Sequence, residues 1–126
     1  MNNIQDYISY RLKRADEAYD EALFLVQKKR WNTIVNRLYY ACFYAVIALL
    51  LKNNIKVNTH RGTLNQFSLH FIKTNKIDIE FGTLYSQLFD FRQKGDYGDM
   101  FDFTKEQVSP LIDHVSHFLK EIKKHI

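Results

Sequence analysis

Residues 38–51 form a continuous apolar stretch that contains no charged side chain. A helix that is apolar on nearly all sides is typical of the central helix of a bundle. The stretch is shorter than the ~20 residues that a helix needs to cross a bilayer, so the sequence predicts a buried core helix and no membrane contact. The whole chain holds four glycines and one proline, which leaves little material for hairpin turns. These features favour helices joined by short connections.

Apolar residues recur at every third or fourth position in five segments, which is the spacing of one helix face. The predicted helices are Asn3–Lys28, Trp31 or Asn32 to Asn53 or Asn54, His60–Lys73, Ile79–Lys94 and Thr104–Lys124. We find none of the alternation that is typical of strands. The predicted fold is therefore all-α, an up-and-down helical bundle of four main helices plus a shorter one, in a single domain over residues 1–126.

Several helix ends carry capping signals. Thr59 is a plausible N-cap of the third helix, and Thr104 with Gln107 fits a capping box at the start of the last. Gly95 occupies the position that favours a left-handed cap, so the fourth helix is expected to end there. Residues 96–103 are then a loop.

Pro110 allows two interpretations of the last helix. If this helix starts at Thr104, Pro110 lies inside it and should bend it. Alternatively, Ser109 is the N-cap and Pro110 is the first helical residue. We favour the longer helix with a bend.

A polar cluster follows the fourth helix, between residues 91 and 99. One helix stripe is shared by Phe81, Tyr85, Leu88 and Arg92. Because this stripe faces the core, the guanidinium of Arg92 needs a partner or a ligand. Asp96 lies one turn later, on or just beyond the same line.

The charge balance is mildly basic, with a formal net charge of +4 and a pI of about 9.1. This balance is compatible with a nucleic-acid or nucleotide partner. Cys42 is the only cysteine and lies in the apolar run, so we expect a reduced, buried thiol and a cytoplasmic protein. The first residues, Met-Asn-Asn-Ile-Gln-Asp, lack the basic and apolar regions of a signal peptide.

No cofactor or metal site is predicted. His114 and His117 share a helix face with Asp113, but a His-x-x-His pair without further ligands is weak evidence for zinc. The chain also lacks a glycine-rich phosphate loop and a nucleophile elbow.

Three motifs occur in order along the chain. They are the run from Asn36 to Ala45, the turn Thr59-His60-Arg61-Gly62, and the segment from Arg92 to Asp99. The first resembles the Tyr-Tyr-Ala-x-Phe-x-Ala signature of the HEPN superfamily (higher eukaryote and prokaryote nucleotide-binding). The other two resemble the Thr-His-x-Gly turn and the Arg-x-x-x-Asp-Tyr segment of one compact prokaryotic branch. The resemblance extends from about Ile8 to Ile122.

The resemblance implies a helical bundle that is usually a homodimer. Many HEPN proteins are encoded beside a minimal nucleotidyltransferase, as toxin and antitoxin. Many are also metal-independent endoribonucleases with an Arg-x(4-6)-His motif, in which the arginine holds the phosphate and the histidine assists attack by the RNA 2′-hydroxyl.

This sequence departs from the ribonuclease motif. Arg92 matches the motif arginine, and Gln93 stands in place of a common asparagine, but no histidine lies four to six residues after Gln93 or anywhere near. Asp96 or Tyr97 stands roughly where the histidine would be. Whether the chain is an enzyme is therefore left open.

The resemblance and the residues together predict two sets of site residues. The candidate catalytic residues are Arg92, Asp96, Tyr97 and His60, with His60 as a surrogate base across the dimer. The candidate nucleotide- or RNA-binding residues are Arg92, Arg37, Tyr40, Tyr44 and Arg61. Two structural alternatives stay open: an ion pair between Arg92 and Asp96 that ties the fourth helix to the bundle, and tyrosines that belong to the core.

Two functions follow as hypotheses. The first is a dimeric module that binds a nucleotide, RNA or a partner protein, as one component of a two-gene system with a minimal nucleotidyltransferase. The second is an endoribonuclease with a noncanonical site, in which Arg92 clamps the phosphate and His60 or Tyr97 transfers the proton. A structural dimer without a ligand is the third option.

Overall fold

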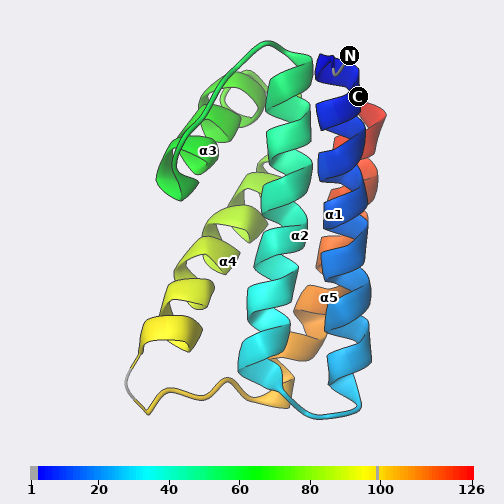
Figure 1. Ribbon diagram of the computed structural model, residues 1–126. Helices are drawn as coiled ribbons and strands as arrows, with labels where there is room; N and C mark the ends of the chain where they lie inside the picture. Colours follow the sequence, from blue (N-terminus) through cyan, green and yellow to red (C-terminus); the bar gives the residue numbers. More distant parts are fainter. Residues whose placement is uncertain (1–2, 99) are drawn as a thin grey trace.

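The computed structural model describes residues 3–98 and 100–126, and in these residues it contains helices and no strand. The helices are α1 (Ile4–Val26), α2 (Trp31–Lys52), α3 (His60–Phe67), α4 (Ile79–Tyr97) and α5 (Lys105–Lys124). A π-helical turn, Ser68–Ile72, continues directly from α3. Helices α1, α2 and α5 run along the length of the molecule, and α3 lies across one end (Figure 1). The predicted all-α bundle of four main helices and a shorter one is confirmed.

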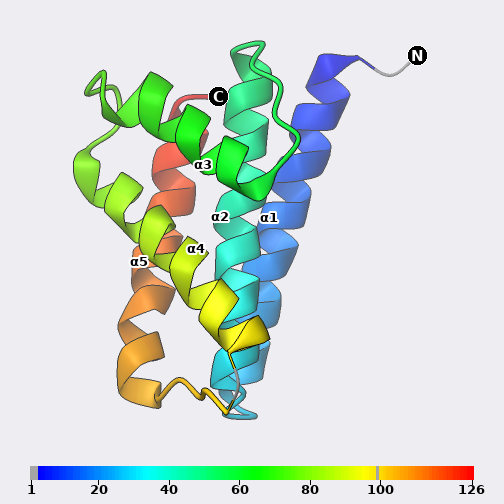
Figure 2. The same cartoon turned by 90° about the vertical axis from the view of Figure 1, so that its left-hand side faces the viewer.

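Helix α2 is the centre of the bundle. Its fully buried side chains include Leu38, Tyr39, Cys42 and Leu49. Helix α1 packs along one side of it, α5 contacts it from behind, and α4 crosses it obliquely (Figures 1 and 2). This enclosure explains why α2 can be apolar on nearly every side.

Helix α2 is also long and apolar enough to cross a membrane, judged by length and composition alone. It has 22 residues, which is more than the 14-residue run that the apolar stretch alone indicated. In the most apolar window of this helix, 61% of the residues are buried inside the bundle. Such burial is typical of a core helix.

Side-chain caps begin two of the helices as the sequence predicts. The hydroxyl of Thr59 accepts a hydrogen bond from the backbone N–H of Gly62 at the start of α3. At the start of α5, Thr104 and Gln107 form the reciprocal bonds of a capping box. Each cap satisfies backbone donors that have no partner within the helix.

Helix α4 does not end at Gly95, and this prediction is wrong. The helix continues to Tyr97, and Gly98 follows it with an ordinary negative φ of −73°. Gly95 instead gives room to the ring of Phe103, since a Cβ at this position would lie 3.1 Å from Phe103 Cε2. Asp96 and Tyr97 are therefore helical residues rather than loop residues.

The connection after α4 is held by one side chain of α2. The amide of Asn32 donates to the carbonyl oxygen of Phe101 and accepts from the backbone N–H of Phe103, both at 2.8 Å. These two hydrogen bonds hold residues 101–103 against the start of α2, where the ring of Phe103 packs against Gly95. Asp99 lies outside the described residues.

Pro110 lies inside α5, so the longer of the two predicted helices is the correct one. The predicted bend stays a prediction. Helix α1 ends at Val26, two residues earlier than expected, and Lys29 in the following turn has a positive φ of 54°.

Candidate functional site

Arg92 is the centre of the candidate site. This residue is only 7% exposed, although it carries a permanent charge. It lies on α4 one turn after Leu88 and two turns after Tyr85, both fully buried, so the helical stripe carries it inward as the sequence predicts. The guanidinium carbon lies 4.9 Å from the ring centre of Tyr39 and 5.9 Å from that of Tyr40. These two aromatic faces of α2 stabilise the cation.

The guanidinium of Arg92 is incompletely paired. Its Nη1 lies 3.9 Å from Asp96 Oδ2, which is an ion-pair distance but longer than a hydrogen bond. Its Nε is buried and has no hydrogen-bond partner in the described part of the chain. A buried donor without an acceptor is unfavourable by about 1–3 kcal/mol. Arg92 therefore has a donor that its neighbours leave unsatisfied, although Nε itself is enclosed by protein.

Asp96 is held by Asn36 rather than by Arg92. The amide of Asn36 donates to Asp96 Oδ2 at 3.0 Å, across the contact between α2 and α4. Its own oxygen accepts bonds from Arg37 Nε at 3.1 Å and from Arg37 Nη2 at 2.8 Å. Asp96 Oδ2 is therefore hydrogen-bonded to Asn36 while it lies 3.9 Å from Arg92 Nη1.

The side chain of Arg37 on α2 pairs with a carboxylate on α1. Its Nη1 lies 3.2 Å from Glu21 Oε1, and its guanidinium carbon lies 5.2 Å from the ring centre of Tyr40. The same ring contacts both Arg37 and Arg92. Two predicted binding residues, Arg37 and Tyr40, are therefore next to the central arginine.

His60 is the first residue of α3 and joins the same cluster. Its Nδ1 lies 2.7 Å from the hydroxyl oxygen of Tyr39, and its ring stacks on Phe43 with centres 4.3 Å apart. Burial lowers the pKa of His60, and the positive charge of Arg92 lowers it further. Burial also raises the pKa of the Tyr39 hydroxyl. Both partners are therefore uncharged at neutral pH.

Three predicted residues lie at the edge of this cluster or outside it. The guanidinium of Arg61 packs on Phe89, at 5.0 Å, and Phe89 in turn contacts the ring of Tyr39. Tyr97 is 76% exposed at the end of α4. Tyr44 contacts Arg11 and Arg14 of α1 rather than Arg92.

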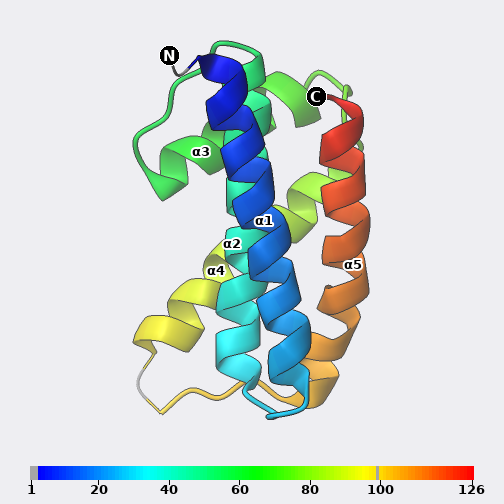
Figure 3. The same ribbon diagram turned by 45° about the vertical axis from the view of Figure 1, so that its right-hand side comes forward.

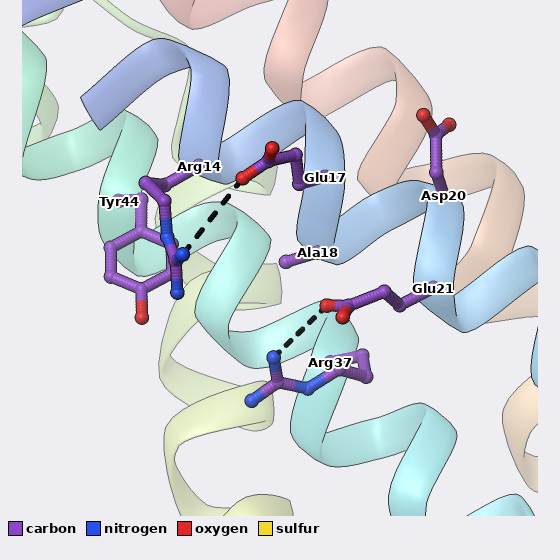
Figure 4. A pocket seen from close by; sticks show the side chains of 7 residues that line it. All are labelled: Arg14, Glu17, Ala18, Asp20, Glu21, Arg37 and Tyr44. Atoms are coloured by element: carbon purple, nitrogen blue, oxygen red, sulfur yellow. Dashed lines mark hydrogen bonds and ion pairs between the residues drawn. The ribbon is translucent and has the colours of Figure 1, made fainter. Parts of the chain in front are cut away.

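Tyr44 instead borders a hollow of about 440 Å³ between α1 and α2. Figure 4 shows its lining, in which Arg14 pairs with Glu17 and Arg37 pairs with Glu21. The lining carries two cations and three carboxylates, so it is not a simple anion site.

The roles of Asn36 and Tyr39 were missed by sequence reasoning. A signal was available, because Asn36, Tyr39, Tyr40 and Phe43 are spaced three or four residues apart and share one face of α2. The partner of that face could not be read from the sequence, since Asp96 lies 60 residues further along the chain.

Among residues 3–98 and 100–126, no three histidine, cysteine or acidic side chains come together as metal ligands would. His114 and His117 are exposed on α5. The site described above is thus built from arginine, tyrosine, amide, imidazole and carboxylate groups.

Comparison with known proteins places this arrangement in a family. The model of the HEPN domain matches residues 8–125. The chain belongs to the HEPN domain family. A UPF0332 protein from Thermotoga maritima is 40% identical over 124 residues, which cover 98% of this chain and 94% of the relative.

Two HEPN relatives from Methanocaldococcus jannaschii are named as candidate toxins. One is 31% identical over 115 residues, which cover 91% of this chain and 78% of the relative. The other is 30% identical over 122 residues, which cover 97% and 90%. This HEPN protein therefore resembles toxin-like relatives along nearly its full length.

Proposed function

We propose that this HEPN protein binds RNA through a phosphate held by Arg92, as the toxin-like component of a two-gene system with a minimal nucleotidyltransferase. The observation that carries the proposal is the guanidinium of Arg92, which is buried, lacks a partner at Nε and has its nearest carboxylate oxygen at 3.9 Å. Arginine donates in a planar fork that matches a phosphate, so an incompletely paired arginine is suited to that ligand.

The surroundings of Arg92 favour a nucleotide over a free phosphate. Tyr40 is half-buried beside Arg92 and Arg37, and its ring can contact a base while the two cations contact the phosphate. The net charge of +4 adds a general attraction to nucleic acid.

The proposal includes a cytoplasmic homodimer in which the end of α4 and the connection after it meet the second subunit. The support for this interface is the position of Arg92 near the end of α4. A dimer built there would bring two Arg92 clusters to one shared surface.

Fluorescence anisotropy with a labelled single-stranded RNA tests the binding. We expect Arg92→Ala to reduce affinity at least tenfold, and Arg92→Lys to reduce it less, because lysine keeps the charge but not the fork. Arg30→Ala is the matched control, since Arg30 is an exposed arginine at the start of α2. Equal affinity of the Arg92 variants and the wild type would refute the proposal, and thermal unfolding confirms that each variant is folded.

A metal-independent endoribonuclease is a second candidate function, and His60 favours it. In the tautomer whose Nδ1–H donates to the Tyr39 oxygen, Nε2 of the neutral ring can accept a proton. The reaction would transfer the proton of a 2′-hydroxyl to His60 while the 2′-oxygen attacks phosphorus and the 5′-oxygen leaves and takes a proton from water. The products are a 2′,3′-cyclic phosphate and a 5′-hydroxyl end.

A cleavage assay with and without EDTA separates the two candidates. The enzyme predicts EDTA-resistant cleavage that both Arg92→Ala and His60→Ala abolish. If the RNA binds but stays intact at high protein concentration, the nuclease is excluded and the binding function remains.

A further inference from the structure

One exposed face of α1 carries a stripe whose residues are spaced alternately three and four apart. We call it the α1 outer stripe: Tyr7, Tyr10, Arg14, Glu17, Glu21 and Phe24. All six residues are exposed, and the three aromatic side chains are 54%, 53% and 63% exposed in chain order. This spacing is that of the a and d positions through which two helices pack side by side.

The α1 outer stripe contacts the bundle only at its margin, where Arg14 lies over the ring of Tyr44 and Glu21 pairs with Arg37 of α2. A different face of α1, with Ile8, Ala15, Ala18 and Ala22, is buried against the other helices. In Figure 3, α1 lies in front of α2 and no other segment covers it. Aromatic side chains are enriched at protein interfaces, so three of them in one exposed line point to a partner.

The order of charges along the α1 outer stripe selects the partner. Arg14 and Glu17 lie on either side of its middle, and Tyr7 and Phe24 lie near its two ends. Reversing the stripe about a point between residues 15 and 16 places position 14 opposite 17 and position 7 opposite 24. Each a position then faces a d position of the other helix, as antiparallel coiled coils require.

We propose that the α1 outer stripe binds the same stripe of a second copy of this chain, with the two α1 helices antiparallel. Arg14 then faces Glu17 of the second copy, and Tyr7 faces Phe24 of the second copy, each contact occurring twice about the two-fold axis. A parallel pair would instead place arginine on arginine and glutamate on glutamate, which is destabilising.

The remaining pair is also complementary. Tyr10 faces Glu21 of the second copy, so a phenol hydroxyl meets a carboxylate acceptor. Within one chain, the carboxylate of Glu21 also pairs with Arg37 of α2 at 3.2 Å, and its side chain stays 58% exposed (Figure 4). No pair in the antiparallel arrangement joins like charges.

The hollow of about 440 Å³ lies beside the middle of the stripe. Three stripe residues line it, namely Arg14, Glu17 and Glu21, with Tyr44 and Arg37 of α2 on its far side (Figure 4). A second α1 laid along the stripe would direct side chains into this space, as knobs enter holes between packed helices.

The strength of the contact is expected to be modest. The stripe extends over about 26 Å of helix, at 1.5 Å per residue. Its ion pairs are exposed: the side chains of Arg14 and Glu17 are 44% and 50% exposed, so the aromatic ends contribute most. A small interface of this kind corresponds to a dissociation constant of about micromolar or weaker.

The proposal does not rest on the RNA-binding function, although the two surfaces meet at Arg37, which pairs with Glu21 of the stripe. Helix α4, with Arg92, lies on the side of α2 away from α1 (Figure 1). A dimer through the end of α4 and a dimer through α1 can therefore coexist, and together they would build a tetramer or a chain of dimers.

Cysteine cross-linking between two differently labelled variants tests the pairing. Tyr7→Cys and Phe24→Cys proteins are mixed under mild oxidation, with Ser9→Cys mixed with Phe24→Cys as the control, since Ser9 is exposed on another side of α1. We expect the mixed disulfide between positions 7 and 24 to form several-fold faster than either homodisulfide and than the control. Faster homodisulfides would show a parallel pair, and equal rates in all mixtures would show no pairing; either result overturns the proposal.

Charge exchange gives a second test by sedimentation velocity. Arg14→Glu alone and Glu17→Arg alone should each weaken the α1 association, and the double variant should restore it. Circular dichroism of each variant confirms the helical fold. If the folded double variant still associates weakly, the antiparallel register is wrong.

Discussion

The hydroxyl of Tyr39 and Nδ1 of His60 are 2.7 Å apart, and this hydrogen bond joins the middle of α2 to the first residue of α3. The guanidinium carbon of Arg92 lies 4.9 Å from the ring centre of Tyr39. One tyrosine therefore connects the two residues with the clearest chemical roles in the proposed site. Its hydroxyl stays protonated because burial raises its pKa.

Tyr39→Phe removes this bond and keeps the ring. We expect the free energy of unfolding to fall by about 1 kcal/mol, the usual contribution of one such bond, as measured by urea denaturation. Tyr97→Phe is the control, because its 76% exposed side chain should leave stability unchanged. An unchanged midpoint for Tyr39→Phe would show that the bond contributes nothing.

His60 should titrate below its ordinary pKa of about 6.5, since burial and the charge of Arg92 both disfavour the imidazolium. NMR of the ring protons against pH measures this value. Arg92→Gln should raise the pKa of His60, and Arg30→Gln should not. A wild-type value at or above 6.5 would contradict the described environment.

The same shift predicts how stability depends on pH. Because the folded-state pKa of His60 is lowered, the unfolded chain binds more protons between the folded-state value and about 6.5. The contribution of His60 is therefore complete above pH of about 6.5 and declines as the pH falls toward the folded-state pKa. In His60→Gln, the loss of stability over this interval should be smaller than in the wild type.

Asn36→Ala should weaken RNA binding although Asn36 need not touch the RNA. Without its amide, Asp96 can close on Arg92 and compete with a phosphate for the guanidinium. We expect a several-fold loss of affinity by anisotropy, and recovery in the double variant Asn36→Ala, Asp96→Ala. Asn53→Ala at the far end of α2 is the control. A double variant no better than the single one would remove this explanation.

Cys42 should react slowly with thiol reagents in the folded protein. Its side chain is fully buried, and burial raises the pKa of the thiol, so little thiolate is present to react. Labelling with a disulfide reagent should be at least tenfold faster in denaturing urea than in buffer. Fast labelling of the native protein would show that α2 opens readily.

Much of this fold follows from patterns within single helices. The apolar run correctly predicted that α2 is the core helix. The spacing of Tyr85, Leu88 and Arg92 correctly predicted that the arginine faces inward. The resemblance also predicted that His60 and Arg92 belong to the same site. Such inferences succeed because helical geometry alone determines which residues share a face.

The errors arise where distant residues decide the local structure. Gly95 looked like the end of α4, but the helix continues because the ring of Phe103 packs on the glycine and Asn32 holds the connection. Likewise, the bond between Asn36 and Asp96 joins residues 60 positions apart. No local pattern encodes such contacts.

The salt dependence of RNA affinity tests the phosphate role of Arg92 most directly. For single-stranded RNA, each phosphate contact contributes about 0.7 to the slope of log affinity against log salt concentration. We predict that Arg92→Gln lowers the affinity and reduces the magnitude of the slope by about 0.7, the value of one phosphate contact. The affinity of Arg30→Gln should stay close to wild type. If Arg92→Gln keeps the wild-type slope and affinity, Arg92 does not hold a phosphate, and the account of this site is wrong.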